Sequence, residues 1–439
     1  MRSIVLAAIC LLVANASVHA QDERTKRLNE DRAAFESSEQ WYYNDLERGF
    51  AEARKSGKPL LVVLRCVPCE ACKVFDEQVA HEDPRIKPLL EQFVCVRVIK
   101  TNGLDLSLFQ SDFDQSFAVF MLNADRTIYG RYGTRPETES QETEMSLEGF
   151  ADTLRQGLEL HQGYPRNRDR LAAKTPGKPR YALPEDLPEL QKYREFAKVE
   201  KLETRMCIHC HQIREAERLE YRKRGAAIPL ETLFTWPATT ALGFALDPNT
   251  SATVADVTKG SPAEQAGLRP DDRLIAVDGQ AVISLADVKW ALDQAGDKLE
   301  VAVELERDDM PLTLALPLAK NWRAKSDISS RVTTWDLRRM VTGGLVLESL
   351  DDETRTELKL SQVELALRVK YVGQYGEHAA GKQAGFQEGD IIVEFDGMIR
   401  RWRETDLIAY GLTERRRGDS VAVTILRDGQ HLERKLPMQ

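Results

Sequence analysis

A string of residues that occurs twice, about 120 positions apart, constrains the fold of this 439-residue chain more than any other feature. Residues 260–275 and 380–392 share an Ala-Gly step, an acidic turn and a short apolar run. Each string is followed by an Asp-Gly pair, Asp278-Gly279 or Asp396-Gly397. A spacing this long indicates duplicated domains, because the stacked units of a solenoid repeat about every 20–50 residues.

The first copy and the residues before it resemble a PDZ domain. The resemblance rests on Gly-Ser-Pro-Ala, Ala-Gly-Leu and Val-Asp-Gly strings and on a preceding loop of four residues, Ala241, Leu242, Gly243 and Phe244. In PDZ domains the backbone N–H groups of this loop bind a terminal carboxylate, and the next strand edge pairs with the peptide. We therefore expect the first copy to bind a protein C-terminus. The second copy has Leu365-Ala366-Leu367 at the expected loop position, without glycine, so a structural role is an equal expectation.

Upstream of the repeats, apolar runs and helical spacing alternate in the order strand, helix, strand, hairpin, helix. The predicted strands are 59–64, 93–99, 117–122 and 127–132, and the predicted helices are 21–56, 70–80 and 147–161. The expected fold class is multidomain, α/β plus mainly-β. The expected boundaries are an α/β domain at 38–162, a linker at 163–188, a charged helical segment at 189–236, a first PDZ-like domain at 238–318, a connector at 319–362 and a second PDZ-like domain at 363–437.

A Cys-x-x-Cys motif, Cys69-Glu70-Ala71-Cys72, follows the first buried run and opens a predicted helix. Backbone N–H groups at a helix start lower the pKa of a thiol, so Cys69 is the expected nucleophile. Cys72 lies one turn further on and can resolve a mixed disulfide. Cys66 is a third candidate thiol, which could form an alternative disulfide or ligate a metal. An inert disulfide or a metal-binding pair is the alternative for the motif.

Residues 38–162 resemble the thioredoxin-like family through the string from Lys58 to Val63 and through the Cys-x-x-Cys motif followed by Lys73. The resemblance implies thiol–disulfide exchange. Two departures predict slow reduction of general disulfides. Phe117 stands where the family has a cis-proline facing the dithiol, and Val63 replaces its buried acid. Cys95 alternates with valines and is expected to be a core residue.

A second cysteine cluster, Cys207-Ile208-His209-Cys210-His211, has the spacing of a covalent c-type haem site. The thiols of Cys207 and Cys210 would bond to the haem vinyl groups, and His211 would ligate the iron. The surrounding segment has few apolar residues to enclose a porphyrin, and no distal ligand is obvious. Zinc and a redox disulfide are therefore the alternatives at these cysteines.

The N-terminus has the pattern of a signal peptide over residues 1–20. Arg2 is followed by an apolar run at 4–13 and by Val18-His19-Ala20, which predicts cleavage after Ala20. The expected location is periplasmic or otherwise extracytoplasmic, with an uncleaved anchor as the alternative. No later segment is apolar enough to span a membrane.

The net charge of -9 excludes nucleic acid as the main expected partner, because no basic excess exists to neutralise phosphates. Periplasmic PDZ proteases resemble the C-terminal half, but the chain has no Gly-x-Ser-x-Gly motif and no room for a protease domain.

The whole chain resembles a bacterial group of thioredoxin-like/PDZ-domain (seleno)proteins, on the Cys-Val-Pro-Cys-Glu-Ala-Cys run, the Cys-Ile-His-Cys-His segment and residues 317–323. Some members have selenocysteine in the redox motif, which implies redox chemistry, whereas this chain has cysteine throughout. The leading hypothesis is an exported thiol–disulfide redox protein whose PDZ domains recruit a partner or client. The alternatives are a c-type haem electron-transfer protein and a non-enzymatic periplasmic scaffold with degenerate redox motifs.

Overall fold

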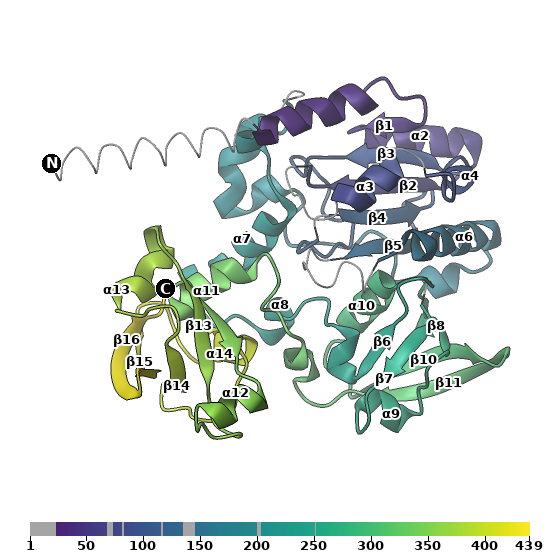
Figure 1. Ribbon diagram of the computed structural model, residues 1–439. Coiled ribbons are helices and arrows are strands. Elements are labelled where there is room, and N and C mark those ends of the chain that lie inside the picture. The colour runs from purple at the N-terminus through teal and green to yellow at the C-terminus, as the bar shows by residue number, and fades with distance from the viewer. Residues whose placement is uncertain are drawn as a thin grey trace. The chain divides into compact units, whose positions relative to one another are not determined.

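The computed structural model describes residues 23–67, 73–80, 83–115, 117–134, 145–199, 203–250 and 252–439. The chain forms two compact units (Figure 1). The first contains Met1–Ile213, Gly243–Ala295 and Glu300–Pro317, and the second contains Arg214–Leu242, Gly296–Leu299 and Leu318–Gln439. No helix among the described residues is both long and apolar enough to cross a membrane.

The first unit is built on a five-stranded sheet with the order β1-β3-β2-β4-β5. β1 and β2 run parallel to β3, whereas β4 runs antiparallel to β2 and β5. Every residue of the central strand β2 is buried, as its continuous apolar run predicts. The strands are β1 (Trp41–Tyr43), β2 (Leu60–Arg65), β3 (Val94–Val98), β4 (Phe117–Leu122) and β5 (Ile128–Thr134).

Alternate residues of this sheet face two separate apolar cores. Leu61 and Val63 of β2 pack on one side, and Leu60 and Val62 pack on the other. Helices cover the sheet: residues 23–35, α2 (Leu46–Ser56), α3 (Lys73–Ala80), α4 (Lys87–Leu90) and α6 (Leu147–Gly163). The side chains of the residues before α2 and α6, an aspartate and a serine, cap the N-termini of these helices, as their residue types favour.

The structure confirms the predicted strands and the closing helix of this sheet to within about two residues at each end. The helical prediction for 21–56 is wrong at β1, where three aromatic residues pair with the edge of β3. The predicted linker at 163–188 is also more ordered than expected. It contains the short helices η1 (Arg168–Leu171) and η2 (Pro184–Asp186), and Leu171 and Lys174 are fully buried.

The first repeat adds a four-stranded sheet, with the order β11-β10-β8-β9, and the pair β6-β7 to the first unit. The repeated string contains the residues that begin and end a short helix, α9 (Pro262–Ala266). The side chain of Ser261 caps its N-terminus, and Gly267 ends it with a φ of 85°. The elements are β6 (Phe244–Leu246), β7 (Val254–Val257), α9 (Pro262–Ala266), β8 (Arg273–Val277), β9 (Gln280–Ala281), α10 (Leu285–Asp293), β10 (Glu300–Arg307) and β11 (Met310–Pro317).

The second repeat follows a similar order in the second unit, around a sheet with the order β12-β13-β14-β15-β16. Helices α11 and α14 pack so closely within this unit that a Cβ atom at Gly411 would overlap Val341. The elements are α11 (Thr334–Thr342), β12 (Leu345–Ser349), α12 (Asp352–Glu357), β13 (Leu367–Val372), η7 (Gly376–Ala379), α13 (Ala380–Gln383), β14 (Ile391–Phe395), α14 (Glu404–Thr413), β15 (Ser420–Arg427) and β16 (Gln430–Pro437).

The second repeat starts upstream of the expected residue 363, because β12 lies inside the expected connector. By element order β12 corresponds to β6, so the loop that matches Leu242-Gly243 is Gly343-Gly344, whose φ angles are 63° and 84°. Leu367, which the sequence pattern placed in that loop, instead begins β13. The insertion of α12 between β12 and β13 displaces the sequence register and explains the difference.

A buried carboxylate joins the α/β sheet to the first repeat within the first unit. Asp287 of α10 lies 3.0 Å from Arg131 of β5 and 3.1 Å from Lys174, and all three side chains are at most 2% exposed. Burial lowers the pKa of Arg131 to about 10 and that of Lys174 to about 8, although the charge of Asp287 opposes both shifts. Both cations also lie over the ring of Trp290. The junction is therefore held by charges that depend on one carboxylate.

Replacing Asp287 with alanine should destabilise the first unit by about 3–5 kcal/mol, because two buried cations lose their shared partner. Chemical denaturation followed by tryptophan fluorescence measures this loss. Asp256→Ala, at an exposed position of the same unit, is the matched control and should change stability little. Equal stability of the two variants would contradict the assigned role of Asp287.

Candidate functional site

The run from Cys66 to Cys72, which we call the redox run, begins at the carboxyl end of β2. Cys66 follows Arg65, the last residue of the strand, and its side chain is half-buried. The predicted pair Cys69 and Cys72 lies outside the described residues, and α3 is described from Lys73 onward. The structure therefore locates the start of the run and the helix after it.

Buried charges hold both ends of this run in place. The Asp76 carboxylate on α3 accepts hydrogen bonds from Arg65 at 3.1 Å and from Arg97 of β3 at 2.7 and 2.9 Å. Arg97 also pairs with Asp31 in the helix at 23–35, and Arg65 donates to the backbone oxygen of Cys66. Burial raises the pKa of Asp76, but the bonds and charges of Arg97 and Arg65 outweigh it, so the net pKa is lowered. Asp76 therefore stays ionised and holds α3 against the end of β2.

The loop after β3 binds the segment that carries the second cysteine cluster. The Asn102 side chain accepts a hydrogen bond from the N–H of Ile208 at 2.9 Å and donates one to the backbone oxygen of Met206 at 3.0 Å. The Thr101 hydroxyl donates to the backbone oxygen of Ile208. Two consecutive side chains of the loop thus bind the backbone on both sides of Cys207.

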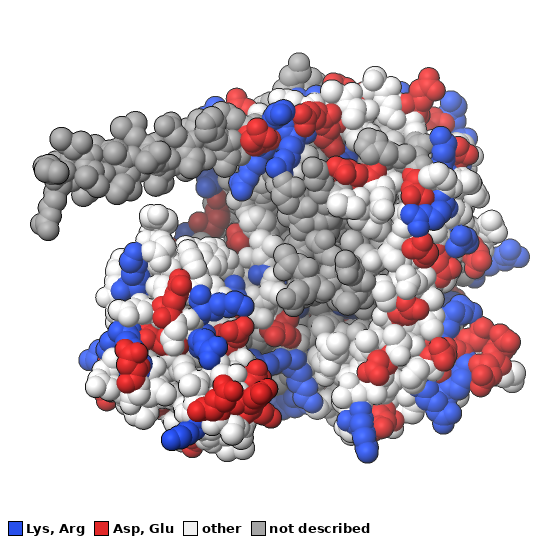
Figure 2. All heavy atoms as spheres, in the orientation of Figure 1, with Lys and Arg blue, Asp and Glu red and all other residues white. Residues whose placement is uncertain are grey.

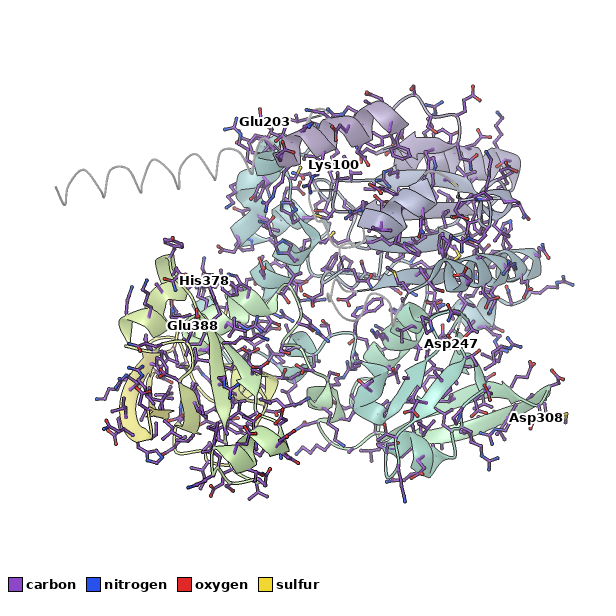
Figure 3. All side chains as sticks on the ribbon, viewed as in Figure 1. Lys100, Glu203, Asp247, Asp308, His378 and Glu388 are labelled. Atoms are coloured by element: carbon purple, nitrogen blue, oxygen red, sulfur yellow. The ribbon has the colours of Figure 1, made fainter. Side chains whose placement is uncertain are left out.

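The same loop extends the contact to a more distant part of the segment. Lys100 donates to the backbone oxygen of Val199 at 3.2 Å. Figure 3 labels Lys100 and also Glu203, which lies in the bound segment. Because β2 and β3 are parallel, their carboxyl ends lie at one edge of the sheet. Cys66 and the second cysteine cluster therefore lie at this edge.

A direct contact joins the clusters: Cys66 Sγ lies 3.2 Å from Nδ1 of His209. Burial, with the nearby charges of His211 and Arg24, lowers the pKa of His209 to about 4, so its imidazole is neutral at pH 7. The unprotonated nitrogen of a neutral imidazole can accept a hydrogen bond from a thiol. Sequence reasoning missed this pair, because 143 positions separate the two residues and no local pattern connects them.

The two predicted haem cysteines are protonated thiols at pH 7. Cys207 is 6% exposed and packs in an apolar cluster with Leu28, while Cys210 begins α7 (Cys210–Lys223). Burial raises the pKa of Cys207 to about 11 and that of Cys210 to about 12. The ring of His211, the predicted iron ligand, stacks on that of His209.

The space beside these cysteines does not fit a haem. Cys66, Cys207, His209 and Cys210 line a cavity of about 20 Å³, which holds about one water molecule. A porphyrin could bond to both thiols only if Cys207 left its apolar cluster. Among the described residues, no three His, Cys, Asp or Glu side chains are placed to hold a metal ion. Haem and zinc remain predictions from the sequence.

The predicted peptide-binding loop of the first repeat contains a glycine that its geometry requires. Gly243 has a φ of 82°, and a Cβ atom there would lie 2.1 Å from Cβ of Ser261. Its backbone oxygen accepts the N–H of Thr258 at 2.8 Å. β6 then follows, and β7 is the strand that pairs with it in the described part of the chain. The other edge of β6 can consequently accept an extended peptide.

The far end of β6 is closed by the α/β sheet. A cavity of only about 10 Å³ remains between Leu246-Asp247, the start of α10 at Ser284 and the β5 residues Tyr132 and Gly133. The Ser146 hydroxyl also donates to the backbone oxygen of Pro248 at 2.9 Å. A peptide along β6 therefore has room for few residues.

The matching strand of the second repeat is blocked. Glu404, at the start of α14, accepts the backbone N–H of Leu347 in β12 at 2.7 Å and is paired with Arg338 of α11. Because the N–H of Leu347 already has a partner, it cannot bind a peptide without breaking this buried pair. This geometry favours a structural role for the second repeat.

Charge is mixed on the face of the molecule that Figure 2 shows. Figure 2 shows acidic and basic side chains interspersed on the visible described surface of both units, without a broad basic patch there. This distribution agrees with the negative net charge and gives no indication of a nucleic-acid interface.

Comparisons with known proteins bear on two of the domains. A thioredoxin-like family model matches residues 40–124, and a PDZ domain model matches residues 240–318. A protein of Brucella suis biovar 1 described as a zinc metalloprotease is 44% identical over 52 residues, which are 12% of this chain and 14% of that protein. Serine protease HTRA1 of Xenopus tropicalis is 34% identical over 67 residues, 15% of each chain. This chain thus spans about one seventh of the length of these curated relatives.

Among solved structures, the HtrA-type protease AlgW with a decapeptide is 16% identical with a TM-score of 0.22, covering 42% of this chain and 54% of that one. The same protease with a tripeptide is 15% identical with a TM-score of 0.21, covering 43% and 57%. The family models show that the chain contains a thioredoxin-like domain and a PDZ domain.

Proposed function

We propose that this protein is an exported thiol–disulfide redox protein whose PDZ domain holds a partner or client by its C-terminus. Cys69 is the attacking thiol and Cys72 the resolving thiol, because Cys69 lies at the start of the predicted helix and Cys72 lies one turn inside it. The observation that best supports redox chemistry is the contact between Cys66 and His209, which brings a thiol of the redox run together with the second cysteine cluster at the carboxyl end of β2.

In this proposal the PDZ domain binds the C-terminus of the client. The loop at Gly243 leads into β6, whose edge can pair with a peptide, and the terminal carboxylate of the peptide would lie at the loop. The thioredoxin-like sheet and the strands of the PDZ domain belong to the same compact unit. Binding a tail here raises the local concentration of the attached client near the thiols.

The redox step is tested by trapping in a Cys66→Ser background, where Cys66 cannot replace the resolving thiol. Cys72→Ser should accumulate a mixed disulfide through Cys69, whereas Cys69→Ser should accumulate none. Nonreducing gels and peptide mass spectrometry read the adduct. Cys95, which is 0% exposed, is the internal control for alkylation by limiting iodoacetamide. If Cys69 and Cys72 react no faster than Cys95, the scaffold hypothesis replaces the redox one.

Peptide capture predicts that C-terminal peptides bind the first repeat and that their amidated forms do not, as calorimetry can measure. Tyr132 and Gly133 of β5 help to close the far end of β6. A decapeptide should therefore bind little better than a peptide of its last few residues. Equal binding of free and amidated peptides would remove the carboxylate loop from the mechanism.

The matched variants for peptide capture are Gly243→Ala and Gly279→Ala. Both glycines have a positive φ, so both substitutions carry the strain of a left-handed backbone. Of the two positions, 243 is the one where the new Cβ would meet another side chain, that of Ser261. Gly243→Ala should therefore lose peptide binding, while Gly279→Ala keeps it.

Export is proposed from the sequence, because residues 1–20 lie outside the described residues. N-terminal sequencing of the protein from the extracytoplasmic fraction should begin at Gln21. Replacing Ala20 with a bulky residue should block cleavage and leave the precursor. Protein that starts at Met1 in the soluble extracytoplasmic fraction would contradict the proposed cleavage.

A further inference from the structure

Three cysteines from two distant parts of the chain meet at one small cavity. Cys66 follows β2, whereas Cys207 and Cys210 belong to the segment bound by the loop after β3. All three residues, together with His209, line the same cavity of about 20 Å³. The cavity has room for about one water molecule, and the contact between Cys66 and His209 lies beside it.

The contact at His209 sets how the segment approaches Cys66. His209 lies between Cys207 and Cys210 in the chain, and its Nδ1 atom is 3.2 Å from Cys66 Sγ. The backbone N–H of His209 donates a hydrogen bond to the side-chain oxygen of Gln212 at 2.9 Å. Cys207 and Cys210 are not bonded to each other in this structure.

Burial distinguishes the two cysteines of the segment. Cys207 packs against Leu28 and Phe196 and is 6% exposed, whereas Cys210 is half-buried, like Cys66. A sulfur atom that attacks a disulfide needs access to the sulfur it attacks. Cys210 is the less buried residue of the pair and is therefore the expected target for Cys66.

We propose that Cys207 and Cys210 form a disulfide that exchanges with Cys66, so that the second cysteine cluster is the internal redox partner of the first. This inference rests on the proposed redox function and assigns the Cys-x-x-Cys-His segment to it.

The exchange balances as two successive displacements. The Cys66 thiolate attacks Cys210 Sγ, the bond between Cys207 and Cys210 breaks, and Cys207 leaves as a thiolate that takes up a proton. A second thiol, from a client protein or from the remaining cysteines of the redox run, then attacks the Cys66 sulfur and releases Cys210. Two thiols have then lost two electrons and two protons, and the original disulfide has gained them. A protein or small-molecule disulfide reoxidises Cys207 and Cys210.

The test forms the product of the first displacement, the Cys66–Cys210 disulfide, in the full chain without Cys207. With Cys66 and Cys210 retained, oxidised glutathione should produce a disulfide between them, because the other thiols that could resolve it are replaced. Nonreducing digestion and mass spectrometry identify the linked peptides, and circular dichroism confirms the fold. The four substitutions are Cys10→Ser, Cys69→Ser, Cys72→Ser and Cys207→Ser.

The matched control adds Cys210→Ser, which should abolish the linked peptides and leave Cys66 open to alkylation. The proposed exchange is overturned if Cys66 and Cys210 of the folded variant are alkylated or glutathionylated separately. It is also overturned if either cysteine links to the buried Cys95. If the Cys66–Cys210 disulfide does not form but Cys69 still forms its mixed disulfide with a client, the proposed function stands and only the exchange is overturned. Failure of the Cys69 adduct with an intact Cys66–Cys210 link would overturn only the proposed function.

Discussion

The buried carboxylate of Asp76 is the interaction on which the thioredoxin-like site depends. It binds Arg65 at the end of β2 and Arg97 on β3, and Arg97 also binds Asp31 in the helix at 23–35. Removing one partner from such a cluster leaves an unpaired charge away from water, which is strongly unfavourable. The cluster therefore holds the strand end that carries Cys66 in place relative to the helix that follows the redox run.

The same physical principle operates at the junction with the PDZ domain. Asp287 is shared by Arg131 and Lys174, so a strand, a helix and the chain segment between the domains meet at one charge. Close packing reinforces this junction, because any side chain at Gly130 would overlap Ile283. The peptide edge at β6 and the thiols at the sheet edge thus belong to one compact unit.

The two repeats differ at the edge of their first strand. Apart from β9 and α12, their helices and strands follow a similar order, and each has glycine before its first strand. In the first repeat one edge of β6 is available to a peptide, whereas in the second Glu404 occupies the N–H of Leu347. Burial raises the pKa of Glu404, and the charge of Arg338 opposes this shift. The Glu404 carboxylate is therefore stable in this buried position only when it is paired with Arg338. At Leu347 one buried acid occupies the backbone N–H that a peptide would need.

The sequence by itself determined the strands of the α/β sheet, the duplication and the two cysteine clusters, because these depend on residues close together in the chain. The continuous apolar run of β2 and the serine cap of α9 are local patterns of this kind. It could not determine β1, the start of the second repeat at β12, or the ordered path of residues 163–188. Only the tertiary structure brought Cys66 to His209, because parallel strands place their carboxyl ends together and the side chains of Thr101 and Asn102 bind a segment about 100 residues further on. Contacts between residues so far apart in the chain leave no pattern in the local sequence, because they form and contribute free energy only when the sheet has formed.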